Sequence, residues 1–508
     1  MIPCVERIAV VDMGSNSWRL VVFGYEPGTP WWSLVDEIRE AVRVGAGVGE
    51  DGLLRPERIE RALHTAAVFD AFCRVSGIDQ VEAVATSAIR DARNGHELLD
   101  DIGRRTALGP RVISGNEEAR YGFLAVVNST TIEHGFGLEM GGGSVQTIRI
   151  AERGLAEAES LPLGSVSVSE EFLPGEKAPA KAMKALRKRV ASDLEGLGWW
   201  TGGGRLVGIG GTIRNLAAAA MKRLDVPDLD VQGFTLTRAA LEELIELLAA
   251  RPASKRGGVP GIKPDRGDVI LGGALVLAAA MDTGGFDALE VTEAGLREGI
   301  FFERLLGEGR LFDDVRRASV ENLAHRFNSD PHHVGHVAAL SLAMFDGLAA
   351  AGLQDLGDEE RELLWAACLL HDIGTAIDYD DHHRHSHYLI LSAGLPGFSP
   401  REVVMIGLIA RYHRKGEPDP SELGDLAETG DGERLRLLCG VIRLAEQLER
   451  SRDRSVRAVR VAAADGGVAL EAETDPRADA TVGIWAARRN ADLLAEALGR
   501  PVEIDAPA

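Results

Sequence analysis

The stretch RIAVVDMGSNSWRLVVF at residues 7–23 predicts a hairpin of two buried strands joined by a polar turn. An apolar run leads into Asp12, glycine and serine follow, and a second apolar run begins near Trp18. A related stretch, HGFGLEMGGGSVQTIRI, occupies residues 134–150 and repeats the order acid-Met-Gly-x-x-Ser. Apolar runs bounded by turn residues are typical of buried strands. We therefore expect two hairpins that open two related α/β halves.

The turns of both hairpins suit an anionic ligand. Glycine and serine let backbone N–H groups approach a phosphate closely. A third glycine turn, Gly208–Thr212, follows an apolar run and precedes the helix-like residues 213–221, where a helix N-terminus can bind an anion. A strand rather than a helix follows each of the first two turns, and no GxxxxGK[ST] occurs, which disfavours a Rossmann or P-loop site. The three turns predict a phosphate site between two lobes.

Composition is that of an ordinary globular protein. The 508 residues include 45% hydrophobic and 26% charged residues, and this length corresponds to about three or four domains. Lys and Arg number 56 against 78 Asp and Glu, so the formal net charge is -22. This charge opposes binding to DNA, RNA or a membrane surface by bulk attraction. A polyanionic ligand therefore requires a locally basic lining.

The cysteines and the apolar runs bear on location. Four scattered cysteines (Cys4, Cys73, Cys368 and Cys439) show no CxxC spacing, which disfavours a disulfide framework or a zinc cluster. No signal pattern is visible at the N-terminus, and no apolar run reaches the ~18 residues that a spanning helix needs. We expect a cytoplasmic protein.

Several motifs occur together in one order: DMGSNS (12–17), SGNEEAR (114–120), GGGS (141–144), GIGGT (208–212) and VTEAGLREG (291–299). With CLLHDIG, HHRHSHY and RYHRK further along, they resemble the exopolyphosphatase/guanosine-pentaphosphate phosphohydrolase (Ppx/GppA) family over roughly residues 6–450. The resemblance implies an α/β, actin-like (ribonuclease H-like) two-lobe ATPase fold, an all-α HD-like domain, a small C-terminal α+β domain and a homodimer. We expect the lobes at 1–125 and 126–306, the helical domain at 307–452 and the last domain at 453–508, with a strand at 458–462 and a helix at 485–498.

The resemblance also implies Mg²⁺-assisted release of a terminal phosphate by water, with Glu118 as the catalytic base. Ser114 and Glu117 have capping-box spacing, so Glu117 caps the helix at 117–127 and Glu118 is left to face the cleft. Arg90 aligns with the family's phosphate-binding arginine, and a guanidinium suits a terminal phosphate. The alternative for both residues is an ordinary solvated side chain.

The glycine loops and the strands beside them contain the candidate metal and phosphate ligands. Asp12, Glu139 and Gln146 are expected to organise Mg²⁺, a cation that prefers oxygen ligands. Glu139 stands where the family pattern has Asp, and Gln146 stands where it has an acid. These two departures predict weaker metal binding or, in the extreme, a sensor without turnover. The expected phosphate-binding residues are Asn16, Ser17, Gly143, Ser144, Gly211 and Thr212.

Histidines concentrate in the helical region, where ten of the 13 lie between His325 and His413. His333, the pair His371-Asp372 and Glu446 follow the order H…HD…D of a phosphohydrolase metal site, with His336 as a competing first ligand. Imidazoles and carboxylates in that order can hold a divalent metal. The alternatives are a packing remnant or a wall of the substrate site.

Basic clusters supply the local positive charge that a polyanion path requires. An ordinary solvated loop is the alternative for each cluster. The candidates for lining such a path are Lys255, Arg256, Arg266, His385, Ser386, Arg411 and His413.

The leading interpretation is an exopolyphosphatase that acts on inorganic polyphosphate. A pppGpp 5′-phosphohydrolase is the second, and a polyphosphate or alarmone sensor without catalysis is a third. An actin-like ATPase or sugar kinase would share the fold only by analogy. A nucleotide hydrolase centred on the histidine region would lose activity on substitution of His371 and keep it on substitution of Glu118.

Overall fold

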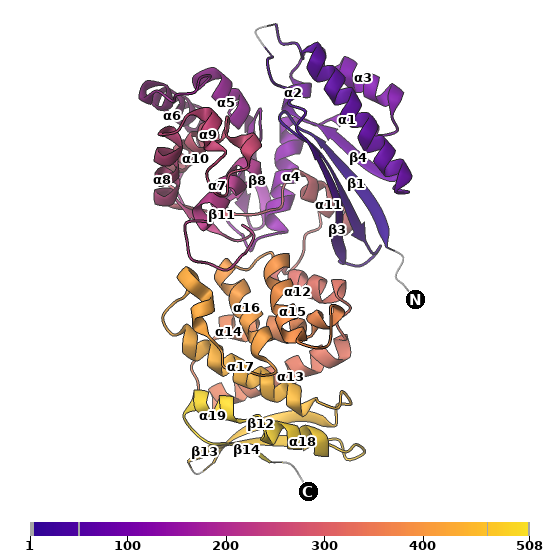
Figure 1. Ribbon diagram of the computed structural model, residues 1–508, viewed down its shortest axis with the longest axis vertical. Coiled ribbons are helices and arrows are strands. Elements are labelled where there is room, and N and C mark those ends of the chain that lie inside the picture. The colour runs from indigo at the N-terminus through magenta and orange to yellow at the C-terminus, as the bar shows by residue number, and fades with distance from the viewer. Residues whose placement is uncertain (1–4, 49–50, 465, 506–508) are drawn as a thin grey trace. The chain divides into compact units, whose positions relative to one another are not determined.

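The computed structural model describes residues 5–48, 51–464 and 466–505. The chain forms two compact units, the first of Met1–Leu224 and Val231–Val315 and the second of Asp225–Asp230 and Arg316–Ala508. The first unit contains two sheets with flanking helices, and the second is mostly helical (Figure 1). The first unit ends at Val315 and not at the predicted residue 306. Phe312 packs against Phe302 of this unit, and the Phe312 N–H donates to the side-chain oxygen of Asn128 at 2.9 Å. Residues 225–230, expected in the second lobe, belong to the second unit.

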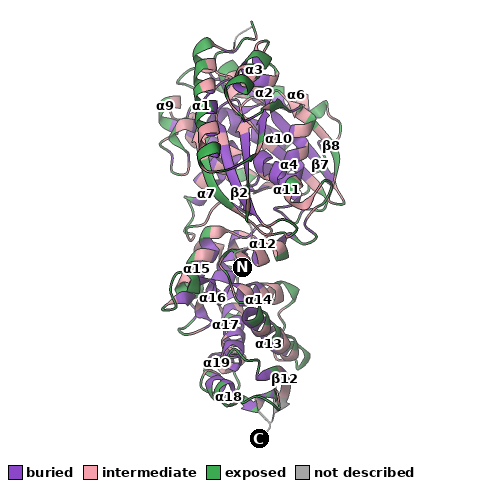
Figure 2. Cartoon of the chain, turned by 90° about the vertical axis from the view of Figure 1, so that its right-hand side faces the viewer, coloured by how far each residue is buried: buried purple, intermediate pink, exposed green. Residues whose placement is uncertain are grey.

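The first sheet has the strand order β3-β2-β1-β4-β5. The first three strands form an antiparallel meander, and β4 pairs parallel to β1. Apolar side chains of α1 and α3 join those of β1 and β2 in one core, while the outer side of α1 is exposed (Figure 2). The bounds are β1 (Glu6–Met13), β2 (Trp18–Tyr25), β3 (Trp32–Glu40), α1 (Pro56–Val75), β4 (Gln80–Ala85), α2 (Ser87–Arg90), α3 (Gly95–Arg105) and β5 (Arg111–Val112).

The second sheet repeats this plan in the order β10-β11-β9-β6-β7-β8. Again an antiparallel meander, β6-β7-β8, carries a parallel strand, β9, beside its first strand. The bounds are β6 (Gly135–Met140), β7 (Val145–Ala151), β8 (Gly154–Leu161), α5 (Ser165–Phe172), α6 (Ala180–Glu195), β9 (Leu206–Ile209), α7 (Gly211–Met221), β10 (Thr235–Thr237), α8 (Arg238–Ala249), α9 (Ala253–Arg256), α10 (Ile270–Gly284) and β11 (Ala288–Val291). The shared plan confirms the two related halves, and the fold is the expected actin-like one.

Two helices, α4 (Gly115–Val127) and α11 (Leu296–Leu306), connect the two sheets. They cross closely at Gly299, where a Cβ atom would lie 2.0 Å from the carbonyl oxygen of Tyr121. Helix α4 packs on the second sheet, whereas α11 packs on β1 and β2, with Phe301 stacked on Phe23 at 4.2 Å. The predicted boundary between the lobes at residue 125 therefore falls inside α4. Helix α11, assigned to the second lobe, lies against the first sheet.

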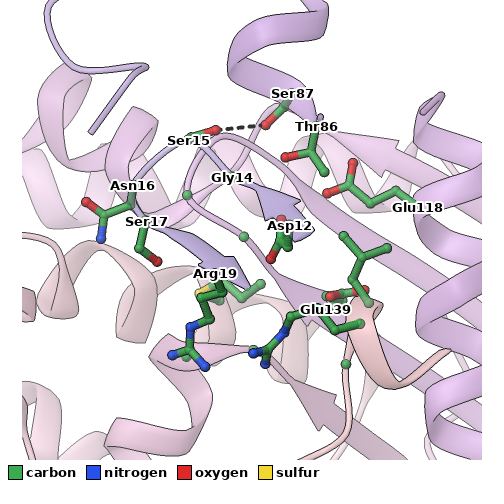
Figure 3. A pocket seen from close by; sticks show the side chains of 18 of the residues that line it. Asp12, Gly14, Ser15, Asn16, Ser17, Arg19, Thr86, Ser87, Glu118 and Glu139 are labelled. Atoms are coloured by element: carbon green, nitrogen blue, oxygen red, sulfur yellow. Dashed lines mark hydrogen bonds between the residues drawn. The ribbon is translucent and has the colours of Figure 1, made fainter. Parts of the chain in front are cut away.

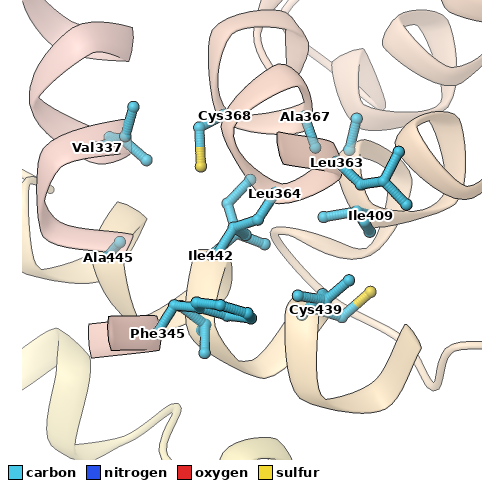
Figure 4. Close-up of a cluster of buried hydrophobic side chains, with 14 of the residues drawn as sticks. Val337, Phe345, Leu363, Leu364, Ala367, Cys368, Ile409, Cys439, Ile442 and Ala445 are labelled. Atoms are coloured by element: carbon cyan, nitrogen blue, oxygen red, sulfur yellow. The ribbon is translucent and has the colours of Figure 1, made fainter. Parts of the chain in front are cut away.

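The second unit has one hydrophobic core, part of which is drawn in Figure 4. Apolar residues of the C-terminal sheet β12-β13-β14 belong to the same core as those of the helices. Residues 453–508, expected as a small domain of their own, therefore share the core and the compact unit of the helical domain. The bounds are α12 (Val315–Arg326), α13 (Pro331–Ala350), α14 (Asp358–Leu370), α15 (His382–Ala393), α16 (Pro400–Tyr412), α17 (Asp431–Leu448), β12 (Val456–Ala464), β13 (Gly467–Thr474), α18 (Thr481–Arg488), α19 (Asp492–Leu498) and β14 (Val502–Asp505), with 3-10 turns at Ile373–Ala376 and Pro420–Leu426.

Three sequence-based expectations have outcomes here. The helix predicted at 485–498 is two helices, α18 and α19, because the chain leaves helical pairing at residues 489–491. Helix α13 is long and apolar enough to cross a membrane by composition, but it packs against α14, α17 and β12 as a core helix does. The thiols of Cys73, Cys368 and Cys439 are free and buried, and Cys4 lies outside the described residues.

Candidate active site

The two glycine loops have matching geometry. In the first hairpin Asp12 pairs across the strands with Arg19, and in the second Glu139 pairs with Gln146. A Cβ atom on Gly14 would lie 3.1 Å from the carbonyl oxygen of Ser17, and one on Gly141 would lie 3.1 Å from that of Ser144. The internal repeat read from the sequence is therefore a structural repeat that places an acid at the same point of each loop.

The loops meet tip to tip. A Cβ atom on Gly143 would lie 2.5 Å from the hydroxyl oxygen of Ser87 and 3.0 Å from that of Ser15. The two serine hydroxyls are themselves 3.1 Å apart in a hydrogen bond. A side chain at residue 143 would require the side chains of Ser15 and Ser87 to shift, so glycine favours this close approach.

A cavity of about 110 Å³ lies between the loops, with room for several water-sized groups. Figure 3 shows Asp12, Glu118, Glu139 and Arg19 around this cavity. Its lining comes from both hairpins and from the beginnings of α2, α4, α7 and α11. The lining residues are Asp12, Gly14, Ser15, Asn16, Ser17, Arg19, Thr86, Ser87, Glu118, Glu139, Met140, Gly141, Gly142, Gly210, Gly211, Arg214, Arg266, Gly295, Leu296 and Arg297.

Glu118 reaches this cavity from the first turn of α4. Glu117 forms the predicted capping box with Ser114, its backbone N–H donating to the serine hydroxyl at 3.2 Å and its carboxylate accepting from Ser114 N–H at 2.9 Å. Glu118 is 6% exposed, and its Oε2 accepts from Nη1 of Arg90 at 3.2 Å. Burial raises the pKa of Glu118 to about 7, against the opposing effect of Arg90. A carboxylate with this pKa suits proton acceptance near neutral pH.

Asp12 and Glu139 bring two further carboxylates to the same cavity, where both side chains are half-buried. Burial raises the pKa of Asp12. Burial, followed by the negative charges of Glu118 and Asp12, raises the pKa of Glu139 to about 8. The Oε2 atom of Glu139 is buried without a hydrogen-bond partner. Three mutually repelling carboxylates and an unpartnered oxygen form a donor set that fits a hard divalent cation.

Four arginines line the same cavity: Arg19, Arg214, Arg266 and Arg297. Burial, with the repulsion of Arg297 and Arg214, lowers the pKa of Arg19 to about 9. Burial, with the repulsion of Arg39, lowers the pKa of Arg266 to about 10. A bound anion relieves this crowding of positive charge, since guanidinium groups bind phosphate oxygens well.

Sequence reasoning gave no role to Arg19, Arg214 or Arg297. A signal was present for Arg19, because the four-residue turn at 14–17 pairs Met13 with Trp18 and then Asp12 with Arg19. For Arg297 the signal was its place in the first turn of a helix, two residues after Gly295.

Comparisons with protein families and with solved structures identify the family of this chain. The model of the Ppx/GppA phosphatase family matches residues 21–308, and the model of domain III of that family matches residues 315–477. The chain belongs to the Ppx/GppA phosphatase family. The crystal structure of the Aquifex aeolicus family member is 28% identical, covers 60% of this chain and 99% of its own, and has a TM-score of 0.52. An exopolyphosphatase from Cytophaga hutchinsonii shares the fold at 22% identity, covering 59% of this chain and 98% of its own, with a TM-score of 0.54.

As a Ppx/GppA phosphatase, the protein is a phosphoanhydride hydrolase, and the cavity is its candidate active site. Asn16, Ser17 and Gly211 line the cavity as expected. Gly143, Ser144 and Thr212 are not among the residues that line it, although Gly143 and Thr212 follow the lining residues Gly142 and Gly211 in sequence. Arg90, expected to bind phosphate, is not among the lining residues and instead donates a hydrogen bond to Glu118, which is.

Gln146 differs from the expectation that it helps to hold a metal. It is fully buried and its Nε2 donates to the hydroxyl oxygens of Ser144 at 2.8 Å and Ser160 at 3.2 Å. The side chain is thus directed along the second sheet by these two hydroxyls, and Gln146 is not among the residues that line the cavity. Glu139, its cross-strand neighbour, is the one that does.

The seven residues expected to line a polyanion path divide into several groups. Arg266 lines the cavity, and Lys255 lies near the end of the short helix α9. Arg256 is 1% exposed with its Nε bonded to the carbonyl oxygen of Leu248, so it cannot line an open path. In the second unit Ser386 and His413 are buried, which contradicts the same expectation. Arg411 pairs with Glu422, and His385 is half-buried on α15.

Glu139 fits its position because residue 122 is glycine. A Cβ atom on Gly122 of α4 would lie 2.5 Å from the Oε2 atom of Glu139. We expect Gly122→Ala to displace this carboxylate and to lower kcat/KM for phosphate release by up to about 10²-fold, since a 1 Å misplacement can have that effect. Steady-state phosphate release measures the loss.

The added change Glu139→Asp shortens the acid by one methylene and is expected to restore part of the activity of the Gly122→Ala chain. Gly103→Ala in α3 is the matched control, because a Cβ atom there meets open space. If Gly103→Ala and Gly122→Ala had equal activity, the contact with Glu139 would have no catalytic role.

Proposed function

We propose that this phosphatase is an exopolyphosphatase, which releases the terminal phosphate of inorganic polyphosphate by attack of water. The observation that carries the proposal is the position of Glu118. Its buried carboxylate, with a pKa of about 7, borders a cavity that also holds two acids and four arginines. Phosphoryl transfer to water requires an oriented nucleophile and neutralised phosphate charge, with little covalent chemistry.

Mg²⁺ is the proposed cofactor, held by Asp12 and Glu139. The unpartnered, buried Oε2 atom of Glu139 and the raised pKa values of both carboxyl groups support this choice. When bound, the cation neutralises negative charge on the phosphoryl oxygens during transfer. Because Gln146 contributes no carboxylate, the affinity for the cation is expected to be lower than with a third acid.

Residues of the chain itself accept the proton, position the base and bind the phosphate. Glu118 accepts a proton from the water whose oxygen bonds to the terminal phosphorus, and the bond from that phosphorus to the bridging oxygen breaks. Arg90 donates to both the Glu118 carboxylate and the carbonyl oxygen of Ile113 and so holds the base in place. Arg19, Arg214 and Arg266 bind the phosphate oxygens. The products are phosphate and a chain that is one unit shorter.

Polyphosphate is favoured over pppGpp by the kind of side chain around the cavity. An adjoining cavity of about 270 Å³ shares Ser15 and Asn16 with the first one. None of the described residues that line either cavity is aromatic, whereas proteins that recognise a base commonly stack it on an aromatic ring. The repeated arginines match a ligand that is charged along its whole length.

Parallel measurement of kcat/KM on long-chain polyphosphate and on pppGpp tests this assignment. We expect polyphosphate to be preferred by at least about tenfold, which corresponds to about 1.4 kcal/mol. A preference for pppGpp would overturn it in favour of a guanosine-pentaphosphate phosphohydrolase.

The pKa of Glu118 predicts how activity depends on pH. A general base acts in its deprotonated form, and burial raises the folded-state pKa of Glu118 from 4.5 to about 7. At limiting Mg²⁺, kcat/KM is therefore expected to increase at least tenfold per pH unit below about pH 7. It should continue to increase up to about pH 8, where Glu139, a proposed ligand of the cation, loses its proton. Higher Mg²⁺ should move the limb to lower pH, because a nearby cation favours the carboxylate form. Profiles at two Mg²⁺ concentrations check both statements.

A further inference from the structure

A second polar cluster is buried in the helical unit, remote in sequence from the loops of the cavity. Its members come from five segments: α13, the end of α14, the start of α15, the end of α16, and α17. Each member is at most 6% exposed. We name it the histidine cluster, and it consists of His333, His371, Asp372, His382, His413 and Glu446. His336, the competing candidate, is outside it and bonds to the carbonyl oxygen of Val456.

The spacing within the histidine cluster is close enough for its atoms to be ligands of one ion. The Oε2 atom of Glu446 lies 3.1 Å from Nε2 of His333 and 3.4 Å from Nε2 of His371. None of these three atoms, Glu446 Oε2, His333 Nε2 and His371 Nε2, has a hydrogen-bond partner. Two ligands at about 2.0–2.1 Å from one metal ion lie roughly 3.0–3.4 Å apart.

A second set shows the same spacing on the other side of Asp372. The Nε2 atom of His382 lies 3.2 Å from Nε2 of His413 and 3.3 Å from Oδ1 of Asp372. Asp372 also lies 3.7 Å from Nε2 of His371 and 3.8 Å from Nε2 of His333. The shared carboxylate therefore stands between two groups of nitrogen atoms.

Backbone contacts determine which imidazole nitrogen carries the proton. The Nδ1 atoms of His371, His382 and His413 lie 2.7, 2.8 and 2.6 Å from the carbonyl oxygens of Cys368, Tyr379 and Ala410. A carbonyl oxygen only accepts, so each Nδ1 must donate, and in the neutral ring each Nε2 presents a lone pair to the cluster. Such Nδ1 contacts are the usual support of metal-bound histidines.

The histidine cluster is thus a set of converging acceptors. Lone pairs from imidazoles and two carboxylates repel one another unless cations lie among them. Arg452 supplies one such charge by bonding to Oδ2 of Asp372 at 2.5 Å. A proton on one Nε2 of the His382–His413 pair would give that pair a hydrogen bond. It would supply no donor to the Nε2 atoms of His333 and His371 or to the carboxylate of Glu446.

We propose that the histidine cluster binds two adjacent divalent transition-metal ions. His333, His371 and Glu446 hold the first, His382 and His413 hold the second, and Asp372 bridges them. Mixed imidazole and carboxylate ligands suit Zn²⁺, Mn²⁺, Fe²⁺ or Ni²⁺, in contrast to the oxygen ligands of the cavity around Asp12. Since the ligands are buried and come from five segments, the ions join these helices and stabilise the unit.

Metal counting on the untagged full-length chain tests the proposal. The Asp12→Asn chain is stripped with a chelator, equilibrated with Mn²⁺ or Zn²⁺, freed of excess ion and examined by elemental analysis, so that the cavity of the first unit contributes less. We expect two ions per chain, one after the added change His382→Gln, and two with the control His332→Gln on the exposed side of α13. A count of one before any change in the cluster would overturn the second position, and a count of zero would overturn both.

Thermal unfolding of the unsubstituted chain gives a second test that needs no variant. A ligand at 100 times its dissociation constant is expected to raise the unfolding midpoint of a unit of this size by about 5 °C or more. Co²⁺ should also give visible absorption bands of a nitrogen-ligated ion. No shift and no bands with any of these metals would contradict the proposal. Neither readout depends on phosphate release, so the proposed function stands or falls separately.

Discussion

Replacing Glu118 with Gln is expected to lower kcat for phosphate release by about 10²- to 10⁴-fold, the range of a lost general base. The amide keeps the shape of the side chain and can accept from Arg90, but it cannot take a proton from water. KM is expected to change little, since the arginines proposed to bind phosphate remain. Steady-state kinetics on polyphosphate measure both constants.

Glu117→Gln is the matched control, because the same chemical change occurs one residue earlier in the helix. Glutamine serves in a capping box as glutamate does, and Glu117 carries no role in the cavity. Its kcat is therefore expected to stay within about twofold of the original chain. Equal losses in the two variants would show that the charge at the helix start, and not proton acceptance by Glu118, underlies the effect.

Asp12→Asn is expected to raise the Mg²⁺ concentration for half-maximal activity by at least about 10- to 100-fold. Loss of a residue that only supports a metal ligand has an effect of that size, and Asp12 is proposed as a ligand itself. The change also removes a negative charge that raises the pKa values of Glu118 and Glu139. The acid limb of the pH profile should therefore move to lower pH in this variant. Mg²⁺ titrations at several pH values test both effects.

Asp36→Asn, on the exposed strand β3, is the control for this second prediction. It removes one acid from the same sheet without touching the cavity and should leave the Mg²⁺ requirement unchanged. An Asp12→Asn chain with the original Mg²⁺ dependence would exclude Asp12 as a ligand, whatever its activity.

Local patterns predicted much of the first unit. Alternation of apolar runs and glycine turns is a short-range signal, so both hairpins, the third glycine turn and the capping box at Ser114 and Glu117 are found where expected. The acids at residues 12 and 139 followed from the same repeat. These features depend on residues that are neighbours in the chain.

Features that depend on distant segments were missed. Arg214 and Arg297 approach the cavity because α7 and α11 begin there, and no local pattern shows where the start of a helix lies in the fold. Helix α11 returns to the first sheet through the stacking of Phe301 on Phe23, a contact between residues far apart in sequence. The shared core of the helices and the C-terminal sheet could not be predicted from local patterns for the same reason.

The histidine cluster shows both sides of this limit. The order His333, His371-Asp372 and Glu446 was visible in sequence, and the structure brings all four together. His413 was instead expected along a substrate path, and His382 had no role. Both reach Asp372 because α15 begins and α16 ends beside it, which depends on how the helices pack.

Isotopic labelling distinguishes hydrolysis by water at the terminal phosphorus from transfer of the phosphoryl group to another acceptor. Polyphosphate is incubated with the protein and Mg²⁺ in ¹⁸O-enriched water, and the released phosphate is analysed by mass spectrometry. Each phosphate released by the original chain is expected to carry one oxygen atom from water, and the Glu118→Gln chain is expected to release little phosphate. Tight binding without release would make the protein a sensor, and release without ¹⁸O would mean transfer to another acceptor. Either result would show that the protein does not hydrolyse polyphosphate with water.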